Sequence, residues 1–252
     1  MTDPTGESVT PLDAIAIAAH PDDAEISLGG TLLELKQRGL RIGIIDLTRG
    51  EMGTRGDESS RAAEAAAANE ILRIDMRENL DLPDGRVEVT LEAREALARL
   101  LRIYQPQVVF AHHTEDLHPD HCAAGQLARE AWYLSGLSRL AEQTGGGKAA
   151  RPRAIYHFMG HVPFDPTFVV DIGDVWEQKV RLIECYATQI TATDPDDEGK
   201  HFLFGADILE RVRSKARYWG EQIGAVYGEP LMHRGPLPFA DPIWVNAQTD
   251  QA

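Results

Sequence analysis

Two short motifs in the sequence combine side chains that bind divalent cations. His-Pro-Asp-Asp at 20–23 directly follows the small and apolar run 14–19, and His-Pro-Asp-His at 118–121 closely follows the strand-like run 107–111. Neutral imidazoles together with carboxylates suit a zinc-like ion, and two His with one carboxylate also suit Fe²⁺ or Mn²⁺. Three protein ligands leave a coordination position for water. The motifs therefore predict a metal site with room for a water molecule.

Each motif alone also has a purely structural interpretation. A His-Pro-Asp-Asp segment commonly caps a helix, because carboxylates near a helix N-terminus interact favourably with its dipole. Two such motifs after strands, with His118 and His121 three residues apart, favour metal binding. Cys122 is interpreted as a packed helix residue. The other histidines are predicted to be surface or hydrogen-bonded core residues, including His112, His113, His157, His161, His201 and His233.

Apolar runs alternate with segments of helical periodicity as far as about residue 134, which is typical of βαβ units around a parallel sheet. Strands are expected at 14–19, 40–48, 107–111, 154–159 and 167–172, with a short strand near 77–82. Helices are expected from about residue 24 to Gly39, over the alanine-rich segment 61–72, and at 91–104, 121–135, 176–186 and 208–220. Thr90 is a plausible N-cap, Pro106 ends the helix that it begins, and 141–153 is predicted to be a loop.

The predicted topology gives the two motifs a common place. In open α/β sheets, functional groups gather at the carboxyl ends of strands, where the strand order reverses. If strands 14–19 and 107–111 are neighbours, both motifs reach one cleft. We therefore predict an α/β, Rossmann-like three-layer fold with a mainly parallel sheet and an active site at the carboxyl ends of its strands.

The composition is that of a soluble globular protein. Of 252 residues, 43% are hydrophobic and 26% are charged, and we expect one domain over 1–252 with a polar N-terminal tail at about 1–12. A net charge of −15 argues against binding to nucleic acid or to an anionic membrane. No apolar run approaches the ~18 residues that a membrane helix needs. With only two cysteines and no signal peptide, a cytoplasmic protein acting on a small molecule is expected.

Several motifs together resemble the LmbE or PIG-L family of zinc-dependent N-acetylglucosaminyl deacetylases. They are AHPDD at 19–23, TRGEMGTRG at 48–56, Arg61 followed by AAEAA, LPDGRV at 82–87 and EDLHPDH at 115–121. The resemblance implies that His20, Asp23 and His121 bind zinc. It implies that Asp22 is the general base, that His118 stabilises the oxyanion or supplies a proton, and that Asp120 orients His118.

The resemblance also implies a substrate. The most similar subgroup is the bacillithiol-biosynthesis deacetylase (BshB type), which acts on N-acetylglucosaminyl malate, and the family pattern places Arg61 and Asp84 against the sugar hydroxyls. Leu117 stands where that subgroup usually has arginine, which weakens the malate assignment. Arg49 and Arg55 could contact an anionic group or could pair with neighbouring acids. Relatives assemble as trimers or hexamers, so a homo-oligomer is expected.

Zinc lowers the pKa of a bound water and polarises the acetamide carbonyl, so acetate and a free amine are the expected products. Within the same chemistry, an amidase of low-molecular-weight thiol conjugates and a broader N-acetyl sugar deacetylase stay open. A noncatalytic sugar-binding module would need neither the metal nor Asp22. A dinucleotide-dependent enzyme is disfavoured, because His-Pro-Asp-Asp stands where a G-x-G-x-x-G turn would be required.

Overall fold

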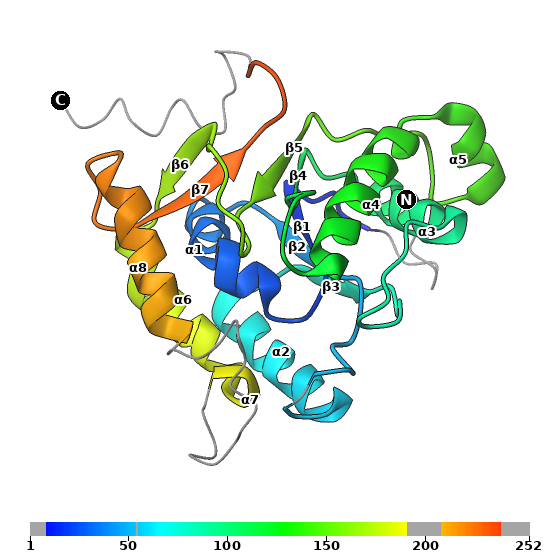
Figure 1. Cartoon of the computed structure of the whole chain (residues 1–252). Coiled ribbons are helices and arrows are strands. Elements are labelled where there is room, and N and C mark those ends of the chain that lie inside the picture. Colours follow the sequence, from blue (N-terminus) through cyan, green and yellow to red (C-terminus); the bar gives the residue numbers. More distant parts are fainter. Residues whose placement is uncertain (1–8, 54, 191–207, 238–252) are drawn as a thin grey trace.

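A mixed β-sheet forms the centre of the molecule (Figure 1). The computed structural model describes residues 9–53, 55–190 and 208–237, so His201 and most of the predicted N-terminal tail lie outside it. Its strands are β1 (Ala14–Ala18), β2 (Ile42–Asp46), β3 (Met76–Asn79), β4 (Val108–His112), β5 (Ala154–Phe158), β6 (Phe168–Asp171) and β7 (Gly228–Met232). They run in the order β3-β2-β1-β4-β5-β7-β6. β1 to β5 are parallel, and β7 is antiparallel to both β5 and β6.

Helices cover both faces of the sheet, which confirms the predicted three-layer α/β fold (Figure 1). They are α1 (Asp23–Gln37), α2 (Glu58–Leu72), α3 (Leu91–Tyr104), α4 (Pro119–Ser135), α5 (Ser138–Thr144), α6 (Trp176–Glu184), α7 (Ala187–Ile190) and α8 (Ile208–Glu221), with a 3₁₀ turn at Gly173–Val175. α1, α2, α6 and α8 pack into one core, and α3 and α4 pack into the other. Among the described residues, no helix is both long enough and apolar enough to cross a membrane.

The central strand β1 shows why its sequence is apolar throughout. Ala14, Ala16 and Ala18 face the core that contains α1, whereas Ile15 and Ile17 face the core that contains α3 and α4. Both faces of the strand are therefore buried, as is usual for a parallel strand between two helix layers. Polar residues can begin only where the strand leaves the sheet.

The order of the strands brings the two predicted motifs together. β1 pairs with β2 on one side and with β4 on the other, so the chain reverses its direction of propagation between β1 and β4. The carboxyl ends of these two neighbouring parallel strands lie at the same edge of the sheet. The prediction that segments 20–23 and 118–121 reach one cleft is confirmed by this arrangement.

The observed ends of several helices can be compared with those predicted from the sequence. Thr90 caps α3, since its side chain accepts a hydrogen bond from the Ala93 N–H at 3.1 Å. α4 begins at Pro119 and not at His121 as predicted, because the His118 side chain caps it. The short helix α5 lies partly inside the predicted loop 141–153. Strand β7 lies between β5 and the edge strand β6. The sequence did not predict it, because glycine and proline are depleted in strands.

A buried ion network ties α1 to the sheet behind the first motif. Arg77 of β3 donates to Glu25 of α1 at 2.6 Å and to both carboxylate oxygens of Asp46 at 2.7 and 3.1 Å. The Tyr186 hydroxyl also donates to Glu25, at 2.8 Å. Because Glu25 is two residues after Asp23, this network fixes the beginning of α1 relative to β2 and β3.

We expect Arg77→Met to lower the free energy of unfolding by about 3–5 kcal/mol, because two buried carboxylates then lose their shared cation. Urea denaturation followed by circular dichroism measures this change. Arg49→Met is the matched control, since Arg49 pairs with Glu58 and Asp81 at the exposed surface and its loss should cost less than about 1 kcal/mol. A similar small loss in both variants would contradict a stabilising role for the network.

Candidate metal centre and active-site cleft

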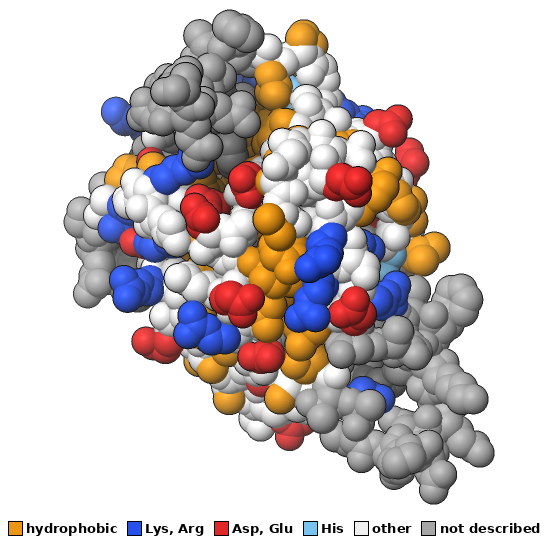
Figure 2. All heavy atoms as spheres, turned by 90° about the vertical axis from the view of Figure 1, so that its left-hand side faces the viewer, with side chains coloured by type: hydrophobic (Ala, Val, Ile, Leu, Met, Phe, Trp, Pro, Cys, Tyr) orange, Lys and Arg blue, Asp and Glu red, His pale blue; other side chains and the backbone are white. Residues whose placement is uncertain are grey.

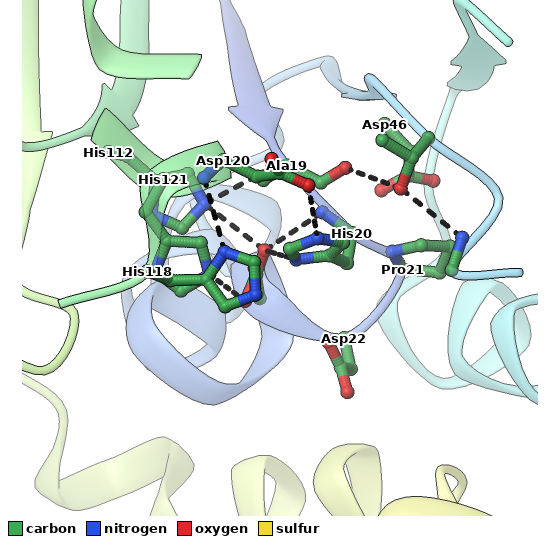
Figure 3. Close-up of polar contacts among 12 residues, drawn as sticks. Ala19, His20, Pro21, Asp22, Asp46, His112, His118, Asp120 and His121 are labelled. Atoms are coloured by element: carbon green, nitrogen blue, oxygen red, sulfur yellow. Dashed lines mark hydrogen bonds and ion pairs between the residues drawn. The ribbon is translucent and has the colours of Figure 1, made fainter. Parts of the chain in front are cut away.

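The two motifs meet at the carboxyl ends of β1 and β4 (Figure 3). His20 lies in the turn after β1, and Asp23 is the first residue of α1. His121 lies in the first turn of α4. One ligand atom from each of these three residues lies within 4.8 Å of the others. The structure therefore brings together the three side chains that the sequence predicts to be metal ligands.

The Asp23 carboxylate lies at the centre of a group of imidazoles. One oxygen lies 3.1 Å from His20 Nδ1 and 3.2 Å from His112 Nε2, and the other lies 3.2 Å from His121 Nε2. Burial raises the pKa of Asp23, but His121, His112 and His20 outweigh burial and lower this pKa well below its usual range. Asp23 is therefore an ionised carboxylate that can bind a cation.

The ring of His20 is oriented by two further carboxylates. Its Nε2 lies 3.1 Å from Asp84 and 3.3 Å from Asp120, on the side of the ring away from Asp23. Asp120 is itself fixed by the backbone N–H groups of Gly85 and Val87, at 2.7 and 3.1 Å. A proton held on Nε2 by these acids leaves Nδ1 free to face Asp23, which is how carboxylates orient histidine ligands at metal sites.

His121 has the same arrangement with its two nitrogens exchanged. Its Nε2 faces Asp23, and its Nδ1 lies 3.4 Å from Asp116. Asp116 also contacts His161 Nδ1 at 2.9 Å and accepts a hydrogen bond from the His161 N–H at 2.9 Å. A Cβ atom at Gly160 would lie 2.2 Å from Asp116, so glycine is required there for this close approach.

The electrostatics of this cluster favour a bound cation. Burial lowers the pKa of His121, but Asp23 and Asp116 outweigh it and raise this pKa to about 9. The same negative field would stabilise a divalent ion in place of the proton. Five carboxylates surround the imidazoles: Asp22, Asp23, Asp84, Asp116 and Asp120. Among the described residues, only Asp22 of these five has an arginine partner. The donor set therefore fits a metal held by two imidazoles and one carboxylate.

Asp22 is adjacent to these ligands but has a different environment. Its side chain points away from the imidazole rings in Figure 3, and it accepts a hydrogen bond from Arg61 Nη1 at 3.0 Å. Its backbone has a φ of 117°, a strained conformation for a residue with a side chain. Burial raises its pKa to about 7 although Arg61 lowers it. A carboxylate with a pKa near neutrality suits proton transfer.

His118 presents a nitrogen that can donate a hydrogen bond. Its Nδ1 accepts from the Asp120 backbone N–H at 3.2 Å, which places the ring proton on Nε2. Burial, followed by the charges of His20 and His121, lowers its pKa, so the ring is neutral near pH 7. The carboxylate of Asp120 was predicted to orient His118, but it faces His20 and the backbone of Gly85 and Val87. The contact to His118 comes from the Asp120 backbone instead.

A cleft with a volume of about 370 Å³ opens beside these residues. The predicted substrate contacts Arg61 and Asp84 both line it, although each also has a partner within the site. Arg55 lines the cleft, whereas Arg49 pairs with Glu58 and Asp81 outside it. Leu117 is exposed and does not line the cleft.

Three residues near the metal ligands were not predicted to contribute. His112 was predicted to be a surface or hydrogen-bonded core residue, and it is a buried one whose Nε2 accepts from the Ala19 N–H at 3.1 Å. Its ring also stacks on His121, a contact that the sequence did not indicate. Asp116 carried no assignment, although its position two residues before the second motif is a local signal. His161 follows β5, and only the pairing of β5 with β4 reveals its proximity.

Comparisons with known proteins agree with this geometry. A family model described as PIG-L, GlcNAc-PI de-N-acetylase, matches residues 15–132. The chain is 38% identical to the conserved protein TT1542 from Thermus thermophilus, with a TM-score of 0.80 over 91% of this chain and 98% of that chain. It is 29% identical to the diacetylchitobiose deacetylase of Thermococcus kodakarensis over 233 residues, covering 86% of this chain and 81% of that protein.

A further similar structure belongs to an enzyme whose name describes a different reaction, a hydration. GalB, the 4-carboxy-2-hydroxymuconate hydratase from Pseudomonas putida, is 25% identical, with a TM-score of 0.72 over 89% of this chain and 97% of that chain. Both motifs and Asp116 lie within the segment that the family model matches, whereas α8 lies outside it.

We expect the purified protein to retain a divalent metal and His121→Ala to lose most of it, because that variant removes one imidazole ligand. Elemental analysis by inductively coupled plasma mass spectrometry, after dialysis, measures the content of both. His113→Ala is the control, since His113 belongs to none of the metal-ligand groups in the described structure. Unchanged metal content in His121→Ala would remove His121 from the ligand set.

Proposed function

The chain belongs to the PIG-L family, and we propose that it is a metal-dependent deacetylase of an N-acetylglucosaminyl small molecule. The observation that carries the proposal is the contrast between two adjacent acids. Asp23 is ionised among three imidazoles, whereas Asp22 has a pKa raised to about 7 and lines the cleft without joining the ligand group. Metal-dependent hydrolysis of an amide uses both a cation site and a base.

The residues present fit a metal held by His20, Asp23 and His121. Zinc is the ion that we propose, and Fe²⁺ or Mn²⁺ would also suit two imidazoles and one carboxylate. When bound, such an ion supplies a water of lowered pKa and polarises the substrate carbonyl. Asp84, Asp120 and Asp116 fix the imidazoles that would hold it, which supports precise placement of the ion.

The protein's own groups would perform the proton transfers. Asp22 accepts a proton as water attacks the acetamide carbonyl, and then delivers it to the departing amine. Arg61 holds the Asp22 carboxylate and also donates to the Pro21 carbonyl at 2.8 Å, so the base keeps a fixed direction. The Nε2–H of His118 donates a hydrogen bond to the oxyanion that develops. The products are acetate and a glucosamine amine.

For the substrate, we propose N-acetylglucosaminyl malate, the acetylated intermediate of bacillithiol biosynthesis, in the cytoplasm. The motifs that resemble the BshB type support this assignment, and Leu117 in place of arginine weighs against it. A broader deacetylase of N-acetyl sugars is the alternative that the likeness to the diacetylchitobiose deacetylase favours. An amidase of thiol conjugates would use the same groups on a different acyl amide.

A hydratase is a second candidate function, favoured by the likeness to GalB. A site that activates water beside a general base could add that water to a polarised carbon–carbon double bond. The amide reaction releases an amine, whereas hydration releases nothing. Incubation with 4-carboxy-2-hydroxymuconate, followed by its ultraviolet absorbance, distinguishes the two reactions.

We expect Asp22→Asn to lower kcat by about 100-fold or more while metal content persists, because the amide cannot accept a proton. In the unmodified protein, Asp22 acts only when ionised, so activity should rise as the pH increases through its pKa of about 7. A cation bound nearby would lower the pKa of Asp22 and so move this rising part of the pH–activity profile to lower pH. The pH dependence of kcat/KM measures it, and an Asp22→Asn variant that keeps both the rate and this rising part would identify another base.

The proposed function itself is tested by amine release. We expect the metal-loaded protein to release acetate and free amine from N-acetylglucosaminyl malate, detected by fluorescamine labelling. Diacetylchitobiose and an S-conjugate of an N-acetylcysteinyl thiol are assayed in parallel. A kcat/KM that is highest for the thiol conjugate would favour the amidase, and no amine from any of the three would contradict the proposal.

A further inference from the structure

Helix α8 forms one wall of the cleft that contains the metal centre. Its Arg211, Val212, Lys215 and Trp219 all line the same cleft as His20 and His121. Arg211 and Lys215 are four residues apart, so their side chains lie on the same face of the helix. The cleft therefore has carboxylates and imidazoles on one wall and two cations on another.

Lys215 is fixed close to the metal ligands. Its Nζ donates to the Gly160 carbonyl at 2.8 Å, and Gly160 precedes His161, which contacts Asp116 beside His121. An ammonium group has three hydrogens, and this contact uses one of them. Partial removal from water and the nearby Arg211 charge lower the pKa of Lys215. An anion bound between these two like charges would relieve their repulsion.

The two cations differ from two others that line the cleft, Arg61 and Lys179. Arg61 is paired with Asp22 at 3.0 Å, and Lys179 is paired with Glu229 at 2.5 Å. Within the described part of the chain, neither Arg211 nor Lys215 forms an ion pair. The chain as a whole carries 40 acids against 25 Lys and Arg, so this lack of carboxylate partners among the described residues is notable. Such groups attract and bind anions.

We propose that Arg211 and Lys215 form a subsite for an anionic group of the substrate, a carboxylate or a phosphate on the part of the molecule distant from the reacting amide. This inference rests on the proposed function and specifies where its substrate is recognised. The subsite stands on α8, outside the segment 15–132 that the family model matches. The reacting groups and the specificity-determining groups would therefore come from separate parts of the chain.

The alternative is that these cations belong to an ordinary solvated helix face. On the outer face of the molecule that carries α8, basic and acidic side chains are interspersed around a hydrophobic band (Figure 2). Arg213 illustrates that pattern, since it is exposed and pairs with Glu210 at 3.3 Å. Lys215 is exposed as well, but it and the half-buried Arg211 line the cleft, and neither has a carboxylate partner in the described structure. Arg213 is therefore a matched control on the same helix.

The test compares kcat/KM for N-acetylglucosaminyl malate with kcat/KM for the neutral methyl glycoside of N-acetylglucosamine. We expect Arg211→Gln and Lys215→Gln each to lower the ratio of these values by about tenfold or more, because each loses a charged hydrogen bond to the anion. Arg211→Lys should recover part of the ratio. Arg213→Gln should leave both values unchanged. A ratio within about twofold of the unmodified protein in both Gln variants would overturn the inference.

A binding measurement separates this inference from the proposed function. If the unmodified protein hydrolyses neither substrate, the proposed function fails, and calorimetric titration with N-acetylglucosaminyl malate decides the subsite. Weaker binding in the double variant Arg211→Gln/Lys215→Gln, with unchanged binding in Arg213→Gln, supports it. Equal affinity in all three proteins overturns it.

Discussion

The structure depends on the interaction of one partly buried carboxylate, Asp23, with the imidazoles around it. An isolated charge is costly to bury, and here each carboxylate around the imidazoles except Asp22 contacts one of them. Asp23 faces His20 and His121, and the far nitrogen of each imidazole faces further acids. The result is an alternating series of carboxylates and imidazoles with surplus negative charge. A divalent cation between the two imidazoles and Asp23 would complete this series.

The fold supplies this series by placing two turns side by side. β1 and β4 are parallel neighbours whose chains leave the sheet at the same edge, and each turn leads into a helix. His20 lies in the first of these turns, whereas Asp23 and His121 lie in the first turns of α1 and α4. Asp22 and Asp23 are adjacent in sequence, yet their environments separate their pKa values. The positive φ of Asp22 directs its side chain away from the imidazoles, and Arg61 and the buried surroundings hold it there. Asp23 is therefore suited to be a ligand and the preceding acid, Asp22, to be a base, a separation typical of acid–base sites.

Much of this could be predicted from the sequence because the signals are local. The ligand motifs, the apolar strands before them and the cap at Thr90 depend on residues close together in the chain. The surrounding contacts could not be predicted, because they depend on which strands become neighbours. Asp116 and His161 meet only when β5 pairs with β4, and the Asp120 carboxylate turns towards His20 because Gly85 and Val87 donate to it. β7 escaped prediction because its Gly228 and Pro230 are poor strand formers, although Pro230 is accommodated opposite Val169.

The most direct measurement of the central claim is anomalous diffraction at the zinc absorption edge from crystals grown with Zn²⁺. The described residues contain three groups that could hold a metal, and the group of His20, Asp23 and His121 shares His20 with one of the others and His121 with the other. We predict an anomalous peak within coordination distance of His20 Nδ1, an Asp23 oxygen and His121 Nε2. A peak between Asp116, His121 Nδ1 and His161, or no peak near Asp23, would contradict the account.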